Sequence, residues 1–202
     1  MSAGRFAGRR ALVTGASRRI GAGIAERLAA EGADVVITAR TRTEHDHLAG
    51  SPEATTARMG AYGTMVGIVV ADLVDAVDRQ RIVLEAMGLL GGAIEILIND
   101  ATAAMYPPVA QFAAKRARIL FEVGQQGSGT TMYGASKAAL NRVTNGLAVE
   151  LYGTGVRVNT IEPRAAVLTV GAAQLVGSTL LPDSQSPGVS RVATWCRRTI
   201  SR

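Results

Sequence analysis

The feature that most constrains the fold is a regular alternation of aliphatic runs and amphipathic stretches over the first hundred residues. Four runs rich in Val, Ile, Leu and Ala predict buried strands, at residues 10–15, 33–40, 66–72 and 94–100. Residues 21–32 and 74–88 have the periodicity of helices. Apolar residues make up 48% of the chain and aromatics only 4%, which suits helices packed over an aliphatic sheet. We predict a single α/β domain with a doubly wound parallel sheet in the spatial order 3-2-1-4.

Other segments depart from this alternation. Residues 41–64 are polar without a clear period and predict a loop with at most one weak helical turn. After residue 100 we expect a helix at about 109–123, a Gly-rich segment without a strand, a long helix and then a strand at 155–161. The long helix carries one apolar face, formed by Met132, Leu140, Val143, Leu147 and Leu151.

The strand at 155–161 needs a partner. Because a gap in the sheet would leave backbone groups unpaired, we expect this strand to pair directly with the fourth. The sheet would then have about five strands, in a domain over residues 1–182. Residues 183–202 have neither helical nor strand periodicity, and we expect them to form a poorly ordered tail.

The composition argues against several classes of function. The net charge of +6 comes mainly from arginines, which are scattered without interleaved aromatics, so we expect no nucleic-acid partner. No apolar run approaches the roughly 20 residues that span a bilayer, and no signal-peptide core precedes the first strand. The single cysteine, Cys196, cannot form an internal disulfide, which favours the cytoplasm. His45 and His47 lie in a polar loop, and we expect no metal site.

A Gly-rich loop, TGASRRIGAG, lies between the first strand and its helix. Backbone N–H groups at the start of such a helix bind phosphate. Gly15 allows the tight turn and Gly21 allows the helix to approach the strand closely. Ser17 and the backbone of Arg18, Arg19 and Ile20 could reach a pyrophosphate. This context favours a dinucleotide site over an ordinary strand-to-helix turn.

The end of the second strand indicates which dinucleotide is bound. An NAD site places Asp or Glu there to hold the ribose 2′-hydroxyl, whereas this chain has Thr-Ala-Arg at 38–40. The guanidinium of Arg40 would pair with a 2′-phosphate, assisted by Arg18, which favours NADP. Asp72, which ends the third strand, either accepts a hydrogen bond from the adenine amine or forms a turn.

Tyr133 and Lys137 are spaced i, i+4 on the long helix and therefore face the same way. A free tyrosine has a pKa of about 10, and a nearby ammonium lowers it. Such a tyrosine can exchange a proton with a carbonyl or an alcohol while a nicotinamide exchanges a hydride.

These motifs, taken together and in this order, resemble the short-chain dehydrogenase/reductase family. The resemblance runs from about residue 8 to 170 and rests on TGASRRIG, on Ala71-Asp72, on INDA at 98–101, on YGASK and on RVNTIEP. It implies a Rossmann-like fold in which Tyr133 is the general acid/base and Lys137 lowers its pKa and binds the nicotinamide ribose. It also implies that further residues lie against the cofactor, namely Asn99, Ala101, Pro163 and Thr169.

The sequence departs from the family pattern in the loop and near the tyrosine. Arg19 replaces the middle glycine of the loop, which we interpret as a variant that favours NADP. INDAT replaces the family's Asn-Asn-Ala-Gly, and Pro163-Arg164 replaces Pro-Gly. The family's catalytic serine, about a dozen residues before the tyrosine, would fall at Leu120 or Phe121. The fifth strand is missing with it, so we infer an internal deletion. The nearest hydroxyls are Ser128, Thr130 and Thr131.

Three hypotheses for function remain at this point. The first is an NADP-dependent oxidoreductase of weakened activity that acts on a small-molecule carbonyl or alcohol. The second is a non-catalytic dinucleotide-binding or interaction protein. The third is an inactive truncated product. The family also implies a homo-oligomer, whose four-helix contact the deletion would weaken.

Overall fold

The computed structural model describes residues 4–43, 50–102 and 130–162 of the chain. Two compact units are distinguished, and each is described by itself. The first comprises Met1–Val70, Glu85–Asp100 and Glu162–Arg202, and the second comprises Ala71–Leu84 and Ala101–Ile161. The predictions for a helix at 109–123, for the segment 124–129 and for the tail lie outside the described residues.

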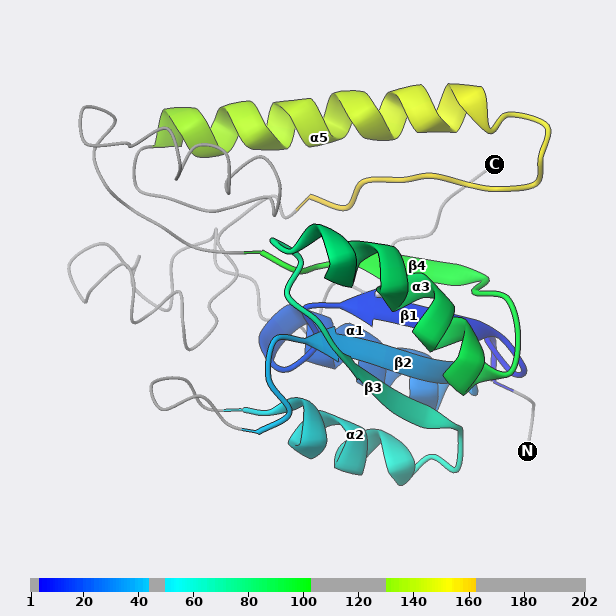
Figure 1. Ribbon diagram of the computed structural model, residues 1–202. Helices are drawn as coiled ribbons and strands as arrows, with labels where there is room; N and C mark the ends of the chain where they lie inside the picture. Colours follow the sequence, from blue (N-terminus) through cyan, green and yellow to red (C-terminus); the bar gives the residue numbers. More distant parts are fainter. Residues whose placement is uncertain (1–3, 44–49, 103–129, 163–202) are drawn as a thin grey trace, which may run out of the picture. The chain divides into compact units, whose positions relative to one another are not determined.

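Four parallel strands form one sheet in the first unit (Figure 1). They are β1 (Arg10–Thr14), β2 (Asp34–Ala39), β3 (Val66–Val70) and β4 (Ile96–Asn99), in the order β3-β2-β1-β4. The predicted α/β class and the order 3-2-1-4 are therefore confirmed. Thr14 is paired in register with Thr38 on one side and with Asn99 on the other, so the carboxyl ends of three strands lie at one edge of the sheet. We call this the carboxyl edge.

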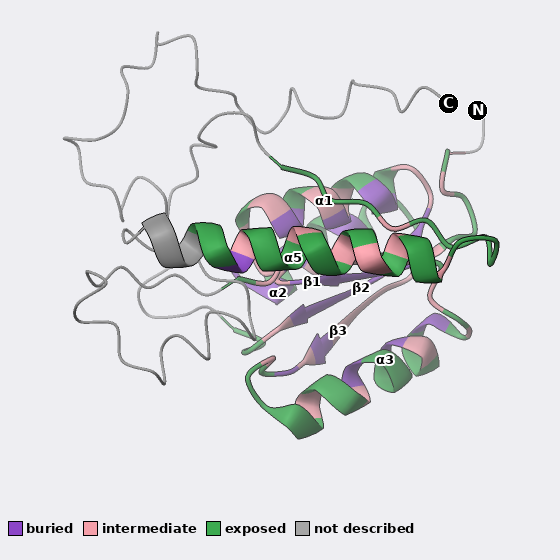
Figure 2. Cartoon of the chain, turned by 90° about the horizontal axis from the view of Figure 1, so that it is seen from above, coloured by how far each residue is buried: buried purple, intermediate pink, exposed green. Residues whose placement is uncertain are grey.

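The core lies between the sheet and two helices, α1 (Arg19–Ala30) and α2 (Pro52–Gly60). Figure 2 shows β1 and β2 as buried strands. Small and aliphatic side chains of α1 let it pack closely on these strands, and Met59 of α2 completes the cluster. Its buried members include Ala11, Val13, Ala25, Leu28, Val35, Ile37 and Met59.

Two further helices agree with the sequence prediction. They are α3 (Ala76–Leu90) and α5 (Thr130–Glu150). On α5, three residues of the predicted apolar face are exposed: Leu140 by 45%, Val143 by 57% and Leu147 by 41%. Within the described ranges, no helix combines the length and the apolar character needed to cross a membrane.

The helix α2 shows that the prediction of a loop over residues 41–64 was wrong. Ser51 caps this helix, because its Oγ accepts a hydrogen bond of 3.0 Å from the backbone N–H of Ala54. Pro52 occupies the first turn, where its missing N–H carries no penalty, and Glu53 complements the helix dipole. The buried side chains of the helix include Thr55 and Met59, which do not form a recognisable apolar period.

The prediction of a strand at 155–161 was also wrong, because these residues form no strand. Val156 is 54% exposed and Ile161 is 83% exposed. Alternating β-branched residues favour a strand only where a neighbouring strand supplies its hydrogen bonds. Among the described residues, β4 pairs with β1 alone, and Leu97 on β4 is 54% exposed.

Polar contacts hold the opposite edge of the sheet, where the strands begin. Arg9 and Arg10 form ion pairs with Glu95, which ties the start of β1 to the start of β4. The backbone N–H of Met65 donates a hydrogen bond of 2.9 Å to Asp34 Oδ1, which ties β3 to β2. Arginines at this edge are therefore paired with carboxylates.

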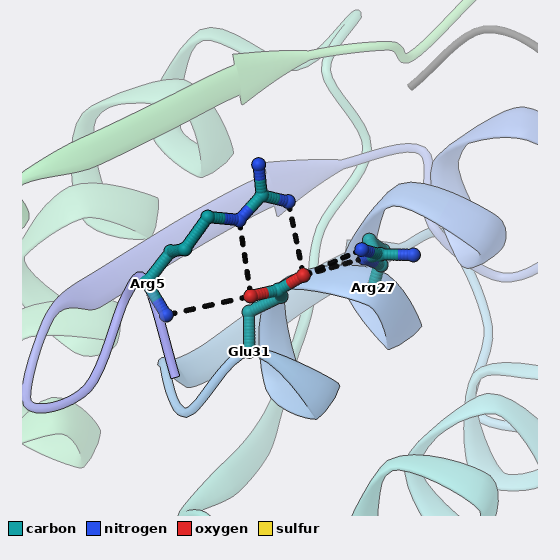
Figure 3. A network of polar contacts seen from close by, with 3 residues as sticks. All are labelled: Arg5, Arg27 and Glu31. Atoms are coloured by element: carbon teal, nitrogen blue, oxygen red, sulfur yellow. Dashed lines mark hydrogen bonds and ion pairs between the residues drawn. The ribbon is translucent and has the colours of Figure 1, made fainter. Parts of the chain in front are cut away.

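Glu31 joins the N-terminal segment to the end of α1 (Figure 3). Its carboxylate accepts hydrogen bonds from Arg5 Nε at 3.1 Å, from Arg5 Nη2 at 2.9 Å and from Arg27 Nε at 3.0 Å. The hydrogen bonds from Arg5 and then from Arg27 lower the pKa of Glu31 from its ordinary 4.5 to about 2. A lowered pKa means that the folded state favours the ionised carboxylate.

We expect this network to make stability depend on pH. The contribution of Glu31 is fully present above its unfolded pKa of 4.5 and is lost as the pH falls toward its folded pKa of about 2. Glu31→Gln should therefore have a lower free energy of unfolding than the wild type at pH 7. This difference in the free energy of unfolding should become smaller as the pH falls from 4.5 to 2. Urea unfolding at several pH values measures this gap. Glu150→Gln removes the same charge from an exposed residue of α5, and a gap of equal size and pH dependence there would contradict the prediction.

Candidate functional site

The Gly-rich loop lies at the carboxyl edge, between the end of β1 and the start of α1. Gly15 has a φ of +71°, a left-handed conformation that turns the chain out of the strand. The backbone N–H of Ala16 donates to the Thr38 carbonyl at 3.3 Å, so the loop is attached to β2. The first intrahelical bond runs from the Ala22 N–H to the Arg18 carbonyl, which leaves the preceding N–H groups of α1 without intrahelical acceptors.

Gly21 brings α1 close to this loop. A Cβ added at Gly21 would lie 2.8 Å from the Gly15 carbonyl oxygen, 2.8 Å from Asp100 Oδ2 and 3.0 Å from the Ala16 Cα. A side chain at this position would therefore push the helix away from the loop. The close approach depends on the absence of a side chain here.

Three arginines gather at the carboxyl edge. Arg18 is half-buried, while Arg19 and Arg40 are exposed. Burial first, and then the charges of Arg19 and Arg40, lower the pKa of Arg18 below its usual range. Arg18 is thus close enough to each of the other two for their charges to interact, and together the three arginines create a positive potential. We call Arg18, Arg19 and Arg40 the arginine cluster.

Among the described residues, two members of the cluster lack the carboxylate partner that several other arginines have. Elsewhere, six arginines form ion pairs with carboxylates: Arg5, Arg9, Arg10, Arg27, Arg58 and Arg81. Within the described ranges, neither Arg19 nor Arg40 has such a partner. The cluster therefore suits an anionic ligand.

Arg19 has a φ of +56°, in the left-handed region. This conformation costs a residue with a Cβ about 1–2 kcal/mol. It explains why the pattern described above carries a glycine at this position.

The helix α2 supports the loop from the side, which sequence reasoning missed. The hydroxyl of Thr55 donates to the Ser17 carbonyl at 3.3 Å, and a Cβ added at Gly50 would lie 3.1 Å from Arg18 Cβ. Arg58 of α2 also pairs with Glu26 of α1 at 3.2 Å. The signal that could have found this support is the sequence Ser-Pro-Glu at 51–53, a typical helix start.

Asn99 and Asp72 end their strands in different ways. Asn99 is exposed at the end of β4, in register with Thr14. Asp72 Oδ1 accepts a hydrogen bond of 3.0 Å from the Val74 N–H, and the Asp72 N–H donates to Asp78 Oδ2 at 2.6 Å. Asp72 therefore forms a turn through Oδ1, and its hydrogen bond with the adenine amine stays a prediction.

Tyr133 and Lys137 lie one turn apart on α5, in the second unit. Ser136 between them is 5% exposed, and Lys137 is half-buried. Thr130 and Thr131 are the first two residues of the same helix. Ala101 precedes the undescribed segment, while Ser128, Pro163 and Thr169 lie outside the described residues.

The structure thus brings together two separate sets of the predicted site residues. One set is the loop, from Gly15 to Gly21, with Arg40 and Asn99 in the first unit. The other is Tyr133 with Lys137 in the second unit.

A shallow groove of about 470 Å³ lies elsewhere, along β3. It is lined by residues of β3, α2 and α3 and by Arg42. None of the predicted site residues lines it, so we do not assign the predicted chemistry to this groove.

Comparison with known proteins agrees with this fold. The chain is 36% identical over 140 residues to the curated human protein Hydroxysteroid dehydrogenase-like protein 2, covering 68% of this chain and 32% of that protein. It superposes with a TM-score of 0.71 on the crystal structure of a short chain dehydrogenase from Burkholderia cenocepacia in complex with NADP, at 30% identity. That match covers 82% of this chain and 77% of the other. The chain thus spans about a third of the length of the human relative.

The alignments also indicate positions that this chain lacks. The alignment with the cattle Hydroxysteroid dehydrogenase-like protein 2, at 26% identity, covers 96% of this chain and 54% of that protein. It runs over 230 positions, whereas this chain has 202 residues, so at least 28 positions (230 minus 202) have no counterpart here.

A family model fits the chain in two pieces. The model described as short chain dehydrogenase matches residues 9–128 and 123–176, and the pieces meet where the sequence predicts a deletion. The two matches together extend over most of the chain. The chain therefore belongs to the short chain dehydrogenase family.

Proposed function

We propose that this protein binds NADP(H) at the carboxyl edge and that Tyr133 and Lys137 serve a slow oxidation or reduction of a small-molecule alcohol or carbonyl. The observation that carries the proposal is the arginine cluster beside the Gly-rich loop. Similarity to the Burkholderia short chain dehydrogenase, whose structure contains NADP, supports the choice of cofactor.

The residues at this edge fit a dinucleotide phosphate. The loop approaches α1 so closely that a Cβ at Gly21 would fill the space, and the first N–H groups of α1 are of the kind that bind phosphate. Guanidinium groups bind a phosphomonoester through charge-assisted hydrogen bonds. Ser17 and the backbone N–H groups of Arg18, Arg19 and Ile20 would hold the phosphates nearest the loop. The guanidinium of Arg40, assisted by that of Arg18, would hold the 2′-phosphate.

The proposed chemistry divides between the ligand and the chain. A bound nicotinamide supplies or accepts the hydride. Tyr133 is proposed to donate a proton to the substrate oxygen during reduction and to accept it during oxidation. The ammonium of Lys137, one turn away, is proposed to favour the phenolate and so to lower the pKa of the tyrosine. Asn99 and Ala101 are proposed to lie against the cofactor after β4, and Pro163 near the nicotinamide.

NADPH is expected to bind at least tenfold more tightly than NADH. The 2′-phosphate would gain charge-assisted hydrogen bonds from the arginine cluster, and a loss of about 1.4 kcal/mol corresponds to a factor of ten. Arg40→Ala should weaken NADPH binding about tenfold while NADH binding changes little. Fluorescence titration with both cofactors at one ionic strength measures this.

Arg42→Ala is the matched control for charge. Arg42 is exposed on the same segment and lies outside the arginine cluster, so its loss should leave the preference for NADPH intact. Equal affinities of the wild type for NADPH and NADH would overturn the cofactor assignment.

A second candidate is a dinucleotide-binding protein without turnover. At least 28 alignment positions lack a counterpart here, and the break in the family match falls just before Tyr133. This candidate shares the binding prediction and differs in turnover. In either case we place the protein in the cytoplasm, on the ground of its single cysteine, and expect at most a weakened homo-oligomer.

A further inference from the structure

We propose that Arg19 is a specificity-determining residue for 2′-phosphorylated nucleotides, and that the ligand-free protein is less stable because of it. This inference rests on the proposed NADP site and deepens it. It concerns the one residue of the loop whose backbone and whose charge are both unfavourable in the free protein.

The unfavourable contributions of Arg19 are independent of each other. Its φ of +56° is a conformation that glycine adopts readily and other residues adopt rarely. Its guanidinium also acts on Arg18 as a like charge and lowers the pKa of that residue. A glycine at position 19 would remove both the strain and the repulsion.

No compensating contact of Arg19 is found within the described residues. Its side chain is exposed, and neither an ion pair nor a side-chain hydrogen bond of Arg19 occurs among them. A bound anion would compensate for the strain and the repulsion at Arg19. This agrees with the general finding that strained residues cluster at ligand sites.

The position of the cluster indicates which anion. Arg40 follows β2, the strand whose end holds the ribose in dinucleotide-binding sheets. Arg18 interacts electrostatically with both Arg19 and Arg40, and Thr14 and Thr38, which precede the loop and Arg40, are paired in register, so the three arginines belong to the same edge of the sheet. A phosphomonoester dianion on the ribose matches three guanidinium groups better than a hydroxyl does. Arg19 would therefore act on the 2′-phosphate together with Arg18 and Arg40.

The test measures stability and binding in the same variants. Arg19→Gly should raise the unfolding temperature of the ligand-free protein by about 2–4 °C, as expected for a chain of this size. It should also weaken binding of 2′,5′-ADP about tenfold, while binding of 5′-ADP changes little. Arg19→Lys keeps the charge and the Cβ, so its unfolding temperature should stay near that of the wild type and its 2′,5′-ADP affinity should fall less. Differential scanning fluorimetry and isothermal titration calorimetry give the two readouts.

The outcomes separate this inference from the proposed function. If the wild type binds neither NADPH nor 2′,5′-ADP, the proposed function fails and the inference fails with it. If the wild type binds 2′,5′-ADP and Arg19→Gly binds it equally well, the inference alone is overturned. A lower unfolding temperature in Arg19→Gly would likewise overturn it, because the strain would then have no measurable effect. Arg42→Gly controls for the loss of one positive charge and the gain of one glycine.

Discussion

Gly21→Ala is expected to lower the free energy of unfolding by about 3 kcal/mol, the upper end of the usual cost of overpacking. The added Cβ would lie 2.8 Å from the Gly15 carbonyl oxygen and 3.0 Å from the Ala16 Cα, and both are backbone atoms of the loop. Backbone atoms cannot rotate away as a side-chain end can, so α1 and the loop would have to separate. We also expect NADPH affinity to fall at least tenfold, because the same atoms shape the proposed phosphate site.

Gly88→Ala is the matched control. Gly88 lies inside α3, and an added Cβ there would have no heavy atom within 4 Å. Alanine favours helix more than glycine does, so this variant should gain about 0.5–1 kcal/mol. Urea unfolding compares the two variants and the wild type. Similar stabilities of Gly21→Ala and Gly88→Ala would show that the loop and α1 do not pack as described.

The sheet could be predicted from the sequence because its signals are local. Each strand is a short aliphatic run, and the helices between strands have their own periodicity. Right-handed crossovers then leave few possible strand orders, and 3-2-1-4 is the order of the Rossmann-like fold that the resemblance implies. The Gly-rich loop was predictable for the same reason, since it lies directly between β1 and α1.

Features that depend on distant contacts could not be predicted in this way. Residues 155–161 have the composition of a strand, but a strand also needs a partner, and these residues pair with none of the described strands. The helix α2 packs through Thr55 and Met59, which show no apolar period, although Ser51 and Pro52 mark its start. At Asp72 the sequence suggested a turn or an adenine contact, and the hydrogen bond from Val74 reveals the turn while the adenine contact stays a prediction.

Arg19 illustrates a different limit. The family pattern has a glycine where this chain has Arg19, and from the sequence alone the replacement predicts only an added charge. The left-handed backbone adds a second consequence, because a position that favours glycine imposes strain on any other residue. A glycine in the family pattern therefore predicts a left-handed backbone as well as a close approach that leaves no room for a side chain. Replacement of this glycine predicts a change in the free energy of unfolding.

Carbonyl reduction by this protein is expected to be slow or absent even when NADPH binds. Tyr133 and Lys137 can supply a proton, but the substrate oxygen must also be held while its negative charge develops. Removing one preorganised donor of that kind typically costs about 2.7–4 kcal/mol, or roughly 10²–10³ in rate. The sequence predicts that the strand carrying the family's serine is missing together with the serine, so the cost should be larger than that of a single side chain.

Steady-state assays with NADPH and a panel of ketones measure this effect. We expect kcat/KM well below about 10⁴ M⁻¹s⁻¹, the lower end for ordinary enzymes, and Tyr133→Phe should abolish whatever turnover remains. A full-length relative in the same assays shows that the panel contains suitable substrates. NADPH affinity should be unchanged in Tyr133→Phe, which separates loss of the proton donor from loss of the fold.

A kcat/KM near 10⁴ M⁻¹s⁻¹ that Tyr133→Phe abolishes would mean that another hydroxyl replaces the serine. Alanine variants of Ser128, Thr130 and Thr131 would then identify that hydroxyl. Because the sequence predicts that the serine and its strand are both missing, slow turnover is the expected result.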